Sequence, residues 1–193
     1  MDLYKSLEVL KSKEPREAWA QRVLNRNSWL TVVAPHGGTI EPLTDRLAVD
    51  IAGSDYNLFV FEGLRRNGRE LHVTSCRFRE PELAELQRLS RLTLSVHGKA
   101  LEHAVTLVGE LNHAVGALII RHLNDVGYLA KRAEFPFSAE SIANFVNLTE
   151  FNGVQLEISK VERDSMRTDG VANERYFLFV ETIRRVLAEA NSL

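Results

Sequence analysis

Cysteine is nearly absent from this sequence, since Cys76 is the single one among 193 residues. One cysteine cannot form an intramolecular disulfide, and one chain cannot assemble a thiolate metal cluster from it. No base is paired with Cys76 in the sequence, so we interpret it as a packing residue rather than a nucleophile. This composition is consistent with a reducing compartment.

The sequence also lacks an excess of charge of one sign and lacks long apolar runs. The formal net charge is -2, with 24 lysines and arginines against 26 aspartates and glutamates. Nucleic-acid-binding domains typically carry a strongly basic face, so we expect no nucleic-acid partner. No segment approaches the length of a membrane span, and charged residues throughout positions 1–23 exclude the apolar core of a signal peptide. We therefore expect no membrane partner and a protein that is cytoplasmic or is released on lysis.

No repeat, low-complexity tract or Ser/Pro-rich linker interrupts the chain, which predicts a single domain over residues 1–193. With 45% hydrophobic residues at this length, the chain can bury a sizeable core. Residues 1–26 are rich in Leu, Glu, Lys and Ala at helical spacing, with a break near Pro15. They predict a helical N-terminal arm over residues 1–28, followed by the core of the protein over residues 29–193.

Strand-like and helix-like segments alternate through that core. Short apolar runs predict strands at 29–34, 56–63, 70–75, 92–96, 103–109 and 154–159. Apolar residues at helical spacing predict helices at 42–53, 80–91, 110–127 and 174–190. The Asn67–Gly68 pair predicts an antiparallel hairpin between the second and third strands. The alternation favours a three-layer α/β/α fold with an open mixed, largely parallel sheet.

Two histidines follow predicted strands of this sheet. His36 ends an apolar run in VVAPHGGTIEPL, and His97 ends another in SVHGK. Ligands of open α/β sheets bind at the carboxyl ends of the strands, so we expect both histidines at one edge. With Glu41, they form a His/Glu/His set of the kind that holds catalytic zinc and leaves a fourth position for water. A surface turn is the alternative interpretation of residues 35–38, because Pro and Gly are common in turns.

A third polar residue, Glu157, lies in the predicted strand GVQLEIS at 153–159. It alternates with Val154, Leu156 and Ile158, so the opposite face of this strand is apolar. At a sheet edge Glu157 would face water, whereas in a central strand its carboxylate needs a partner. Beside zinc, such a carboxylate can take a proton from water and deliver it to the leaving nitrogen of an amide. We therefore predict Glu157 as a catalytic general base.

Several short blocks together resemble one known family, the phage-type poly-γ-glutamate hydrolases, whose relatives are often labelled phage-related replication proteins. The blocks are HGGTIEP, FVFEG, LHVTS, FREP, SVHG, VTLVG, IANFVN and GVQLEIS, in order between about residues 30 and 165. The resemblance implies a zinc carboxypeptidase-like fold and one Zn²⁺ used to cleave γ-linked glutamate amides. It implies His36, Glu41 and His97 as zinc ligands and Glu157 as general base. It gives no counterpart for the N-terminal arm.

Other polar residues are weaker candidates for the same site. Arg77, Arg79 and Arg163 follow predicted strands and are candidate contacts to an anionic substrate, since arginine binds carboxylates through paired hydrogen bonds. Solvated surface positions are the alternative for each of them. Asn147 either lines the cleft or caps a helix. His72 either orients a zinc ligand from outside the ligand set or packs in the core.

The sequence and the resemblance together predict a zinc-dependent hydrolase of amide bonds, with the γ-glutamyl linkages of poly-γ-glutamate as first candidate substrate. We expect the partner to be a glutamate-containing polymer or peptide. Two alternatives stay open: a zinc carboxypeptidase or amidase that acts on another peptide or small amide, and a phage-associated binding module that keeps the fold without turnover. The oligomeric state and the physiological metal are open at this stage.

Overall fold

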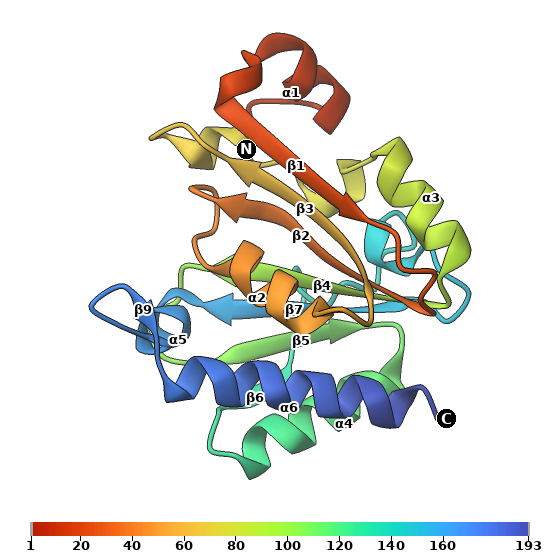
Figure 1. The fold of residues 1–193 in the computed structure, drawn as a ribbon, viewed down its shortest axis with the longest axis vertical. Coiled ribbons are helices and arrows are strands. Elements are labelled where there is room, and N and C mark those ends of the chain that lie inside the picture. Colours follow the sequence, from red (N-terminus) through yellow and green to blue (C-terminus); the bar gives the residue numbers. More distant parts are fainter. Residues whose placement is uncertain (1, 193) are drawn as a thin grey trace.

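The computed structural model describes residues 2–192, which are built around a seven-stranded sheet of order β1-β3-β2-β4-β7-β5-β6 (Figure 1). The strands are β1 (Trp19–Leu24), β2 (Leu30–Gly38), β3 (Asn57–Gly63), β4 (Leu92–Lys99), β5 (Thr106–Glu110), β6 (Ala130–Arg132) and β7 (Gly153–Ser159). The pairs β3–β2, β2–β4, β4–β7 and β5–β6 are parallel, whereas β1–β3 and β7–β5 are antiparallel. The predicted mixed, largely parallel sheet is confirmed.

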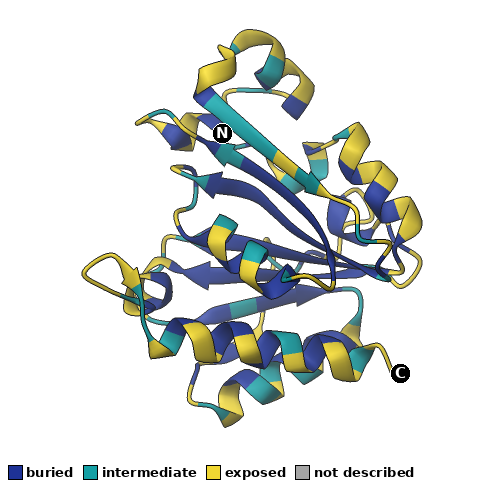
Figure 2. Cartoon of the chain, viewed as in Figure 1, coloured by how far each residue is buried: buried dark blue, intermediate teal, exposed yellow. Residues whose placement is uncertain are grey.

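Helices cover both faces of the sheet. One face packs against α2 (Thr44–Ala52), α4 (His113–Asp125) and α6 (Glu174–Ala190), and the other against α1 (Leu7–Lys13) and α3 (Pro81–Leu89). The helix α5 (Lys160–Ser165) and the small ribbon β8 (Arg167–Thr168) and β9 (Val171–Ala172) follow β7. Figure 2 shows the central strands buried between these two layers, which confirms the α/β/α architecture. None of the helices formed by residues 2–192 has the length and apolar character needed to cross a membrane.

The central strands β4 and β7 are apolar on one face and polar on the other. The apolar residues, which pack under α2, α4 and α6, are Leu92, Leu94, Val96, Val154, Leu156 and Ile158. Side chains of a strand alternate between faces, so His97, Gln155 and Glu157 lie on the opposite face, toward α1 and α3. In the parallel register, His97 is the direct partner of Glu157. The alternation thus places two predicted site residues side by side.

The N-terminal arm differs from the prediction of a helix over residues 1–28. Among residues 2–28, only Leu7–Lys13 form an α-helix, and Trp19–Leu24 form β1, which pairs with β3 from Gly63 back to Leu58. Residues 19–24 have helical spacing, but pairing with β3 stabilises them as a strand. Part of this stabilisation is the stacking of Trp19 on Phe61 of β3, with ring centroids 5.7 Å apart. The arm is therefore partly an edge strand of the sheet.

The predicted hairpin over residues 56–75 is also wrong. Residues 70–75 do not form a strand; 3₁₀ turns span Gly68–Leu71 and Ser75–Arg77. The physical reason is that both edges of β3 are occupied, by β2 on one side and β1 on the other. The chain after β3 instead crosses toward the carboxyl ends of the strands, where His72 contacts His36.

Candidate active site

A β-bulge in β2 decides where His36 points. The register between β2 and β3 shifts between Ala34 and Gly37, so β2 contains one extra residue there. Pro35 lies within this irregular stretch, where its missing N–H is tolerated. Ala34 packs under α2, and strict alternation would send His36 to that same face. The bulge turns His36 to the opposite face, where its ring centroid is 4.9 Å from that of His97.

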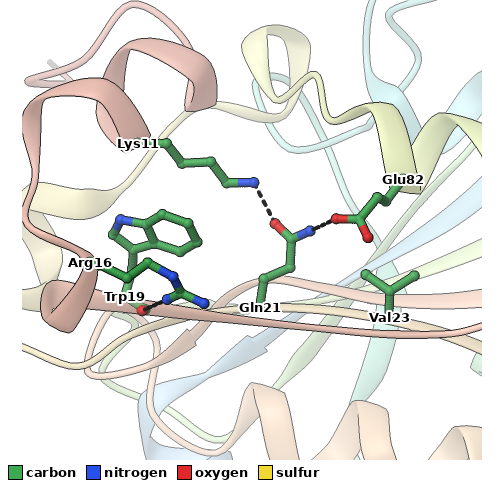
Figure 3. A pocket seen from close by; sticks show the side chains of 6 residues that line it. All are labelled: Lys11, Arg16, Trp19, Gln21, Val23 and Glu82. Carbon is green, nitrogen blue, oxygen red and sulfur yellow. Dashed lines mark hydrogen bonds between the residues drawn. The ribbon is translucent and has the colours of Figure 1, made fainter.

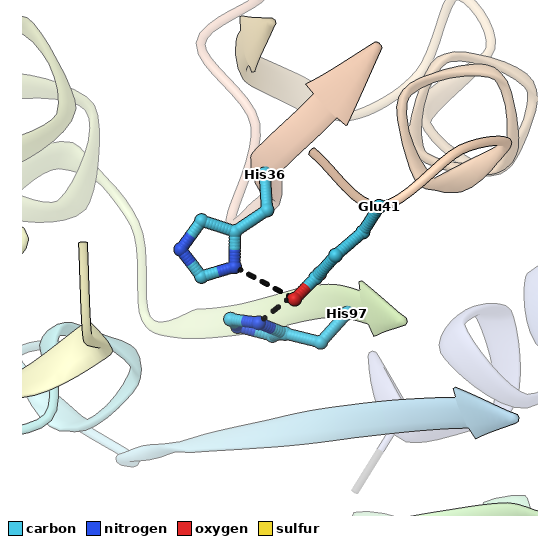
Figure 4. Close-up of side chains that lie close together, drawn as sticks. All are labelled: His36, Glu41 and His97. Atoms are coloured by element: carbon cyan, nitrogen blue, oxygen red, sulfur yellow. Dashed lines mark ion pairs between the residues drawn. The ribbon is translucent and has the colours of Figure 1, made fainter. Parts of the chain in front are cut away.

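Three of the predicted site residues converge at this edge of the sheet. Nδ1 of His36 is 3.2 Å from Oε1 of Glu41, and Nδ1 of His97 is 3.7 Å from Oε2 of the same carboxylate (Figure 4). One ligand atom from each residue lies within 4.8 Å of the other two. The backbone N–H of Gly98 donates to Glu41 Oε2 at 2.8 Å and holds the carboxylate in place. Two imidazole nitrogens and a carboxylate oxygen are a donor set that zinc uses in catalytic sites.

The hydrogen bonds of His36 suit it to ligate a metal. Its Nε2 lies 3.0 Å from the carbonyl oxygen of Val73, which can only accept, so Nε2 carries the hydrogen. In the neutral ring Nδ1 then offers a lone pair toward Glu41 and His97. Because the hydrogen is on Nε2, this buried Nδ1 faces the Glu41 oxygen at 3.2 Å without a hydrogen bond. A buried nitrogen without a partner is costly, and a cation held among the three residues would satisfy it.

The pKa values of the three residues follow from burial and from their mutual contacts. Burial alone would raise the pKa of Glu41, but the neighbouring His36 and His97 and the Gly98 amide lower it to about 2. Burial lowers the pKa of His97 to about 3. Burial is the largest effect on His36 and acts to lower its pKa, but the charge of Glu41 and the hydrogen bonds of the protonated ring to Glu41 and Val73 together outweigh it, so the net shift is upward. Glu41 is therefore ionised and His97 neutral at pH 7, the forms that bind a metal.

Glu157 lies in a central strand, because β7 is flanked by β4 and β5. The alternative of a solvent-facing edge position is therefore wrong. The residue is 7% exposed, and burial, followed by repulsion from Glu41, raises its pKa to about 8. A dication held by the three neighbouring residues would lower this pKa, since a bound metal is the largest local charge in such a site.

The comparison with known proteins decides the family. The family model of poly-γ-glutamate hydrolase matches residues 4–181 of the chain. The chain belongs to the poly-γ-glutamate hydrolase family. The match includes α1 and β1, so the N-terminal arm, for which the short blocks gave no counterpart, is part of the family's common sequence.

Relatives and solved structures agree with this family. The SPbeta prophage-derived UPF0714 protein YoqZ of Bacillus subtilis (strain 168) is 31% identical over 199 residues, covering 97% of this chain and 72% of that protein. A structure of a bacteriophage poly-γ-glutamate hydrolase superposes with a TM-score of 0.95 at 29% identity, covering 100% and 99% of the two chains. A zinc-free structure of YndL superposes with a TM-score of 0.89 at 27% identity, covering 98% and 99%. The chain is thus a hydrolase with the fold of these two proteins.

In this member of the poly-γ-glutamate hydrolase family, a chain of side-chain amides orients Glu157. Asn144 donates to Oε1 of Gln155 at 3.0 Å, and Gln155 donates to Oε1 of Glu157 at 2.9 Å. All three are buried. Sequence analysis missed Gln155, although its position two residues before Glu157 on the polar face of β7 was a usable signal. The amide network leaves the second oxygen of Glu157 available to a substrate or water.

Replacement Gln155→Leu tests this orienting role. The leucine keeps the approximate volume but removes the hydrogen bond to Glu157, so we expect turnover to fall by roughly 10- to 100-fold, the range for groups that support a metal site from outside. Zinc content should stay at the parental level, because Gln155 contacts none of the three candidate ligands. The control is Gln21→Leu on the edge strand β1. If Gln155→Leu turns over substrate at the parental rate, Gln155 does not orient Glu157.

His72 lies at the exposed rim of the site. Its ring centroid is 4.1 Å from that of His36, and its Nε2 is 4.0 Å from Oε1 of Glu41. Its other nitrogen, Nδ1, is 2.8 Å from Oδ1 of Asp2, and the side chain is 34% exposed. Burial, together with the charge of His36, lowers the pKa of His72. The role of His72 as an orienting partner of the ligands stays a prediction, and the contact with Asp2 was not expected.

Arg163 and Asn147 are buried and bonded to the backbone. Arg163 donates from Nε to the carbonyl of Ile158 at 3.2 Å and from Nη1 to the carbonyl of Pro42. It thereby joins the residue after Glu41 to the residue after Glu157. Asn147 donates to two carbonyls of its own loop, those of Ala139 at 2.6 Å and Ser141 at 3.0 Å. These contacts hold the loops around the site, and the roles of Arg163 and Asn147 in substrate binding stay predictions.

Two further cations are the exposed Arg79 and a half-buried residue that sequence analysis missed, Lys99. Arg79 donates to the carbonyl of Ala143 at 2.7 Å, and Lys99 ends β4 with its Nζ 3.7 Å from the ring centroid of Phe137. Lys99 lies two residues after His97 on the same face of β4, and its charge acts to lower the pKa of Glu157. The signal for Lys99 was its position two residues after His97 in SVHGK.

Two surface hollows lie away from the three candidate ligands. One, of about 320 Å³, lies over β1 and is lined by Lys11, Arg16, Trp19, Gln21, Val23 and Glu82 (Figure 3). Its polar groups are engaged with one another, since Gln21 accepts from Lys11 at 2.6 Å and donates to Glu82. The other, of about 530 Å³, lies beside α2 and α6. Neither competes with the His/Glu/His group as the site of chemistry.

Proposed function

We propose that the chain is a zinc-dependent hydrolase that cleaves the γ-glutamyl amide bonds of poly-γ-glutamate. The observation that carries this proposal is the convergence of His36, Glu41 and His97 on the face of the sheet that also bears Glu157. In this assignment the first three residues hold zinc and Glu157 is the general base. Zinc, when bound, acts as a Lewis acid on the amide carbonyl and raises the acidity of water.

The residues of the chain have separate tasks in this reaction. Glu157, held by the Gln155 amide, accepts a proton from the water that attacks the amide carbon. A C–O bond forms, the C–N bond breaks, and Glu157 returns the proton to the leaving nitrogen. The burial of Glu157 removes bulk water from its carboxylate, which strengthens its interaction with the charges that develop during the reaction.

The anionic polymer is favoured by the family and by the charges at the site. Each residue of a γ-linked glutamate chain carries a free α-carboxylate next to its amide. Lys99 lies on the same face of β4 as His97, and Arg77 and Arg79 come from the segment that follows His72. Guanidinium and ammonium groups bind carboxylates. A zinc carboxypeptidase or amidase acting on a neutral amide would not need them.

The test combines metal analysis with turnover at several salt concentrations. We expect about one zinc per chain and cleavage of poly-γ-glutamate into shorter fragments. We expect kcat/KM on the polymer to fall severalfold as salt rises from about 0.1 M to 1 M, since the screening length shrinks from roughly 10 Å to 3 Å. Fragment release is measured by gel filtration and free amino groups.

Two control substrates separate the alternatives. A γ-linked glutamate oligomer whose α-carboxylates are converted to amides is neutral, and its cleavage should depend little on salt. Polyglutamate with α-linkages carries the same charge as the polymer but has the wrong linkage, so it should not be cleaved. Equal salt profiles for the neutral and anionic substrates would favour the general amidase. Absence of any amide cleavage by the zinc-loaded protein would favour the binding module.

A further inference from the structure

The carboxylate of Asp2 is held by a set of three donors, which we call the carboxylate cage. The backbone N–H of Thr74 donates to Oδ2 at 2.8 Å, Nη2 of Arg77 donates to the same oxygen at 2.5 Å, and Nδ1 of His72 lies 2.8 Å from Oδ1. The Asp2 side chain is only 9% exposed. Burial acts to raise the pKa of Asp2, but the hydrogen bonds from Thr74 and His72 outweigh it and lower the pKa, so the group is an ionised carboxylate.

The cage lies next to the candidate metal site. His72 belongs to both, since its Nδ1 faces Asp2 while its Nε2 is 4.0 Å from Glu41 and its ring packs on His36. The carboxylate of Asp2 is thus separated from the candidate ligands by one imidazole ring. All three donors come from the short segment 72–77 that crosses the carboxyl ends of the strands.

We propose that the carboxylate cage is a subsite for a carboxylate of the substrate, and that Asp2 occupies it in the free protein. A guanidinium, a backbone N–H and an imidazole N–H are donors suited to a carboxylate of any origin. This inference rests on the proposed function, in which the substrate carries a free carboxylate on every residue. An incoming carboxylate would take over the same donors, so the exchange conserves the hydrogen bonds of the cage.

The surroundings of the cage permit this exchange. Arg77 is 44% exposed and His72 is 34% exposed, so solvent reaches both side chains. Asp2 is connected to the fold through the exposed Leu3, and the next anchor is Tyr4, which bonds to Glu14. Asp2 therefore acts as an internal competitor, and only the fraction of molecules in which it has left the cage binds the substrate carboxylate there.

A second role for Asp2 makes the opposite prediction. If Asp2 serves only to orient His72, its removal loosens the site, and the affinity for a carboxylate ligand falls or does not change. If Asp2 occupies a subsite, its removal frees Arg77 and Thr74, and the affinity for a carboxylate ligand rises. The two roles are therefore distinguished by the sign of one measurement.

The experiment measures binding of glutarate, a small dicarboxylate, to the zinc-loaded full chain by isothermal titration calorimetry. We expect Asp2→Ala to bind glutarate roughly fivefold more tightly than the parent, the gain expected from removing a partly exposed ion-pair competitor. Glutaramide, the neutral analogue, should bind the two proteins equally. The double variant Asp2→Ala/Arg77→Met should lose the gain.

Further variants make the result decisive. Asp55→Ala removes an exposed aspartate paired with Arg184 at a distance from the cage and should leave glutarate affinity unchanged. Asp2→Asn is the second variant if Asp2→Ala does not fold, and it should shift the affinity in the same direction by less. Unchanged or weaker glutarate binding in the folded variant overturns the subsite. If Asp2→Ala binds glutarate more tightly but the parent does not cleave poly-γ-glutamate, the subsite is retained and the proposed function is rejected. If the parent cleaves the polymer and glutarate binding is unchanged in Asp2→Ala, the proposed function is retained and the subsite is rejected.

Discussion

The variant Glu157→Gln is expected to fold and to retain about one zinc per chain, yet to turn over poly-γ-glutamate at least roughly 10²-fold more slowly than the parent. Glutamine has nearly the size of glutamate and still accepts a hydrogen bond from Gln155, but it cannot take up a proton at neutral pH. The loss should therefore appear in kcat rather than in zinc content. Initial rates, elemental analysis and a thermal unfolding curve on the same preparation measure all three quantities.

The matched control is Glu102→Gln, which makes the same chemical change at an exposed position beyond β4. It should keep parental rates and zinc content. If Glu157→Gln turns over every substrate at the parental rate, Glu157 is not the base and another group must move the proton. If that variant loses zinc as well, Glu157 belongs to the ligand set and the three-ligand assignment is incomplete.

The variant His36→Ala should lose both zinc and activity. Its Nδ1 faces Glu41 at 3.2 Å, and removing it leaves one imidazole and one carboxylate to hold the ion. Zinc that binds only the folded protein stabilises it by an amount that rises with the logarithm of the zinc concentration relative to Kd, about 2.7 kcal/mol at 100 times Kd. We therefore expect added zinc to raise the melting temperature of the parent and to leave that of His36→Ala nearly unchanged.

His103→Ala is the control for this prediction, because His103 is exposed and lies outside the ligand set. It should behave as the parent in zinc titration and turnover. A His36→Ala protein that binds one zinc as tightly as the parent would show that the ion is held elsewhere. Wild-type turnover in the same variant would remove the metal from the mechanism.

Local patterns in the sequence were sufficient for most of the fold and for the grouping of His36, Glu41 and His97 at one edge of the sheet. Alternation in GVQLEIS placed Glu157 on the polar face of β7, and the final helix was predicted with the observed bounds, Glu174–Ala190. Both signals depend on residues close together in the chain. The strand β1 was missed because its residues, WAQRVL, include good helix formers, and only pairing with β3 makes them a strand.

Contacts between segments that are far apart in the sequence could not be predicted from these local patterns. Asp2 and His72 are 70 positions apart, and no periodicity connects them. Arg163 was predicted as a cation for substrate, but its position relative to Pro42 depends on how α5 follows β7, which spacing alone does not determine. The amide network behind Glu157 joins a loop to a strand in the same way, through Asn144 and Gln155.

The bulge in β2 depends on the length of the chain between Ala34 and Gly37. Deletion of the single residue Pro35 would remove the bulge, yet it would place the histidine directly after Ala34, and alternation alone would then keep it on the face that bears His97. The bulge is required because two residues, an even step, separate His36 from Ala34. In a homologue that is one residue shorter in this stretch, we therefore expect a regular strand with the histidine on the same face.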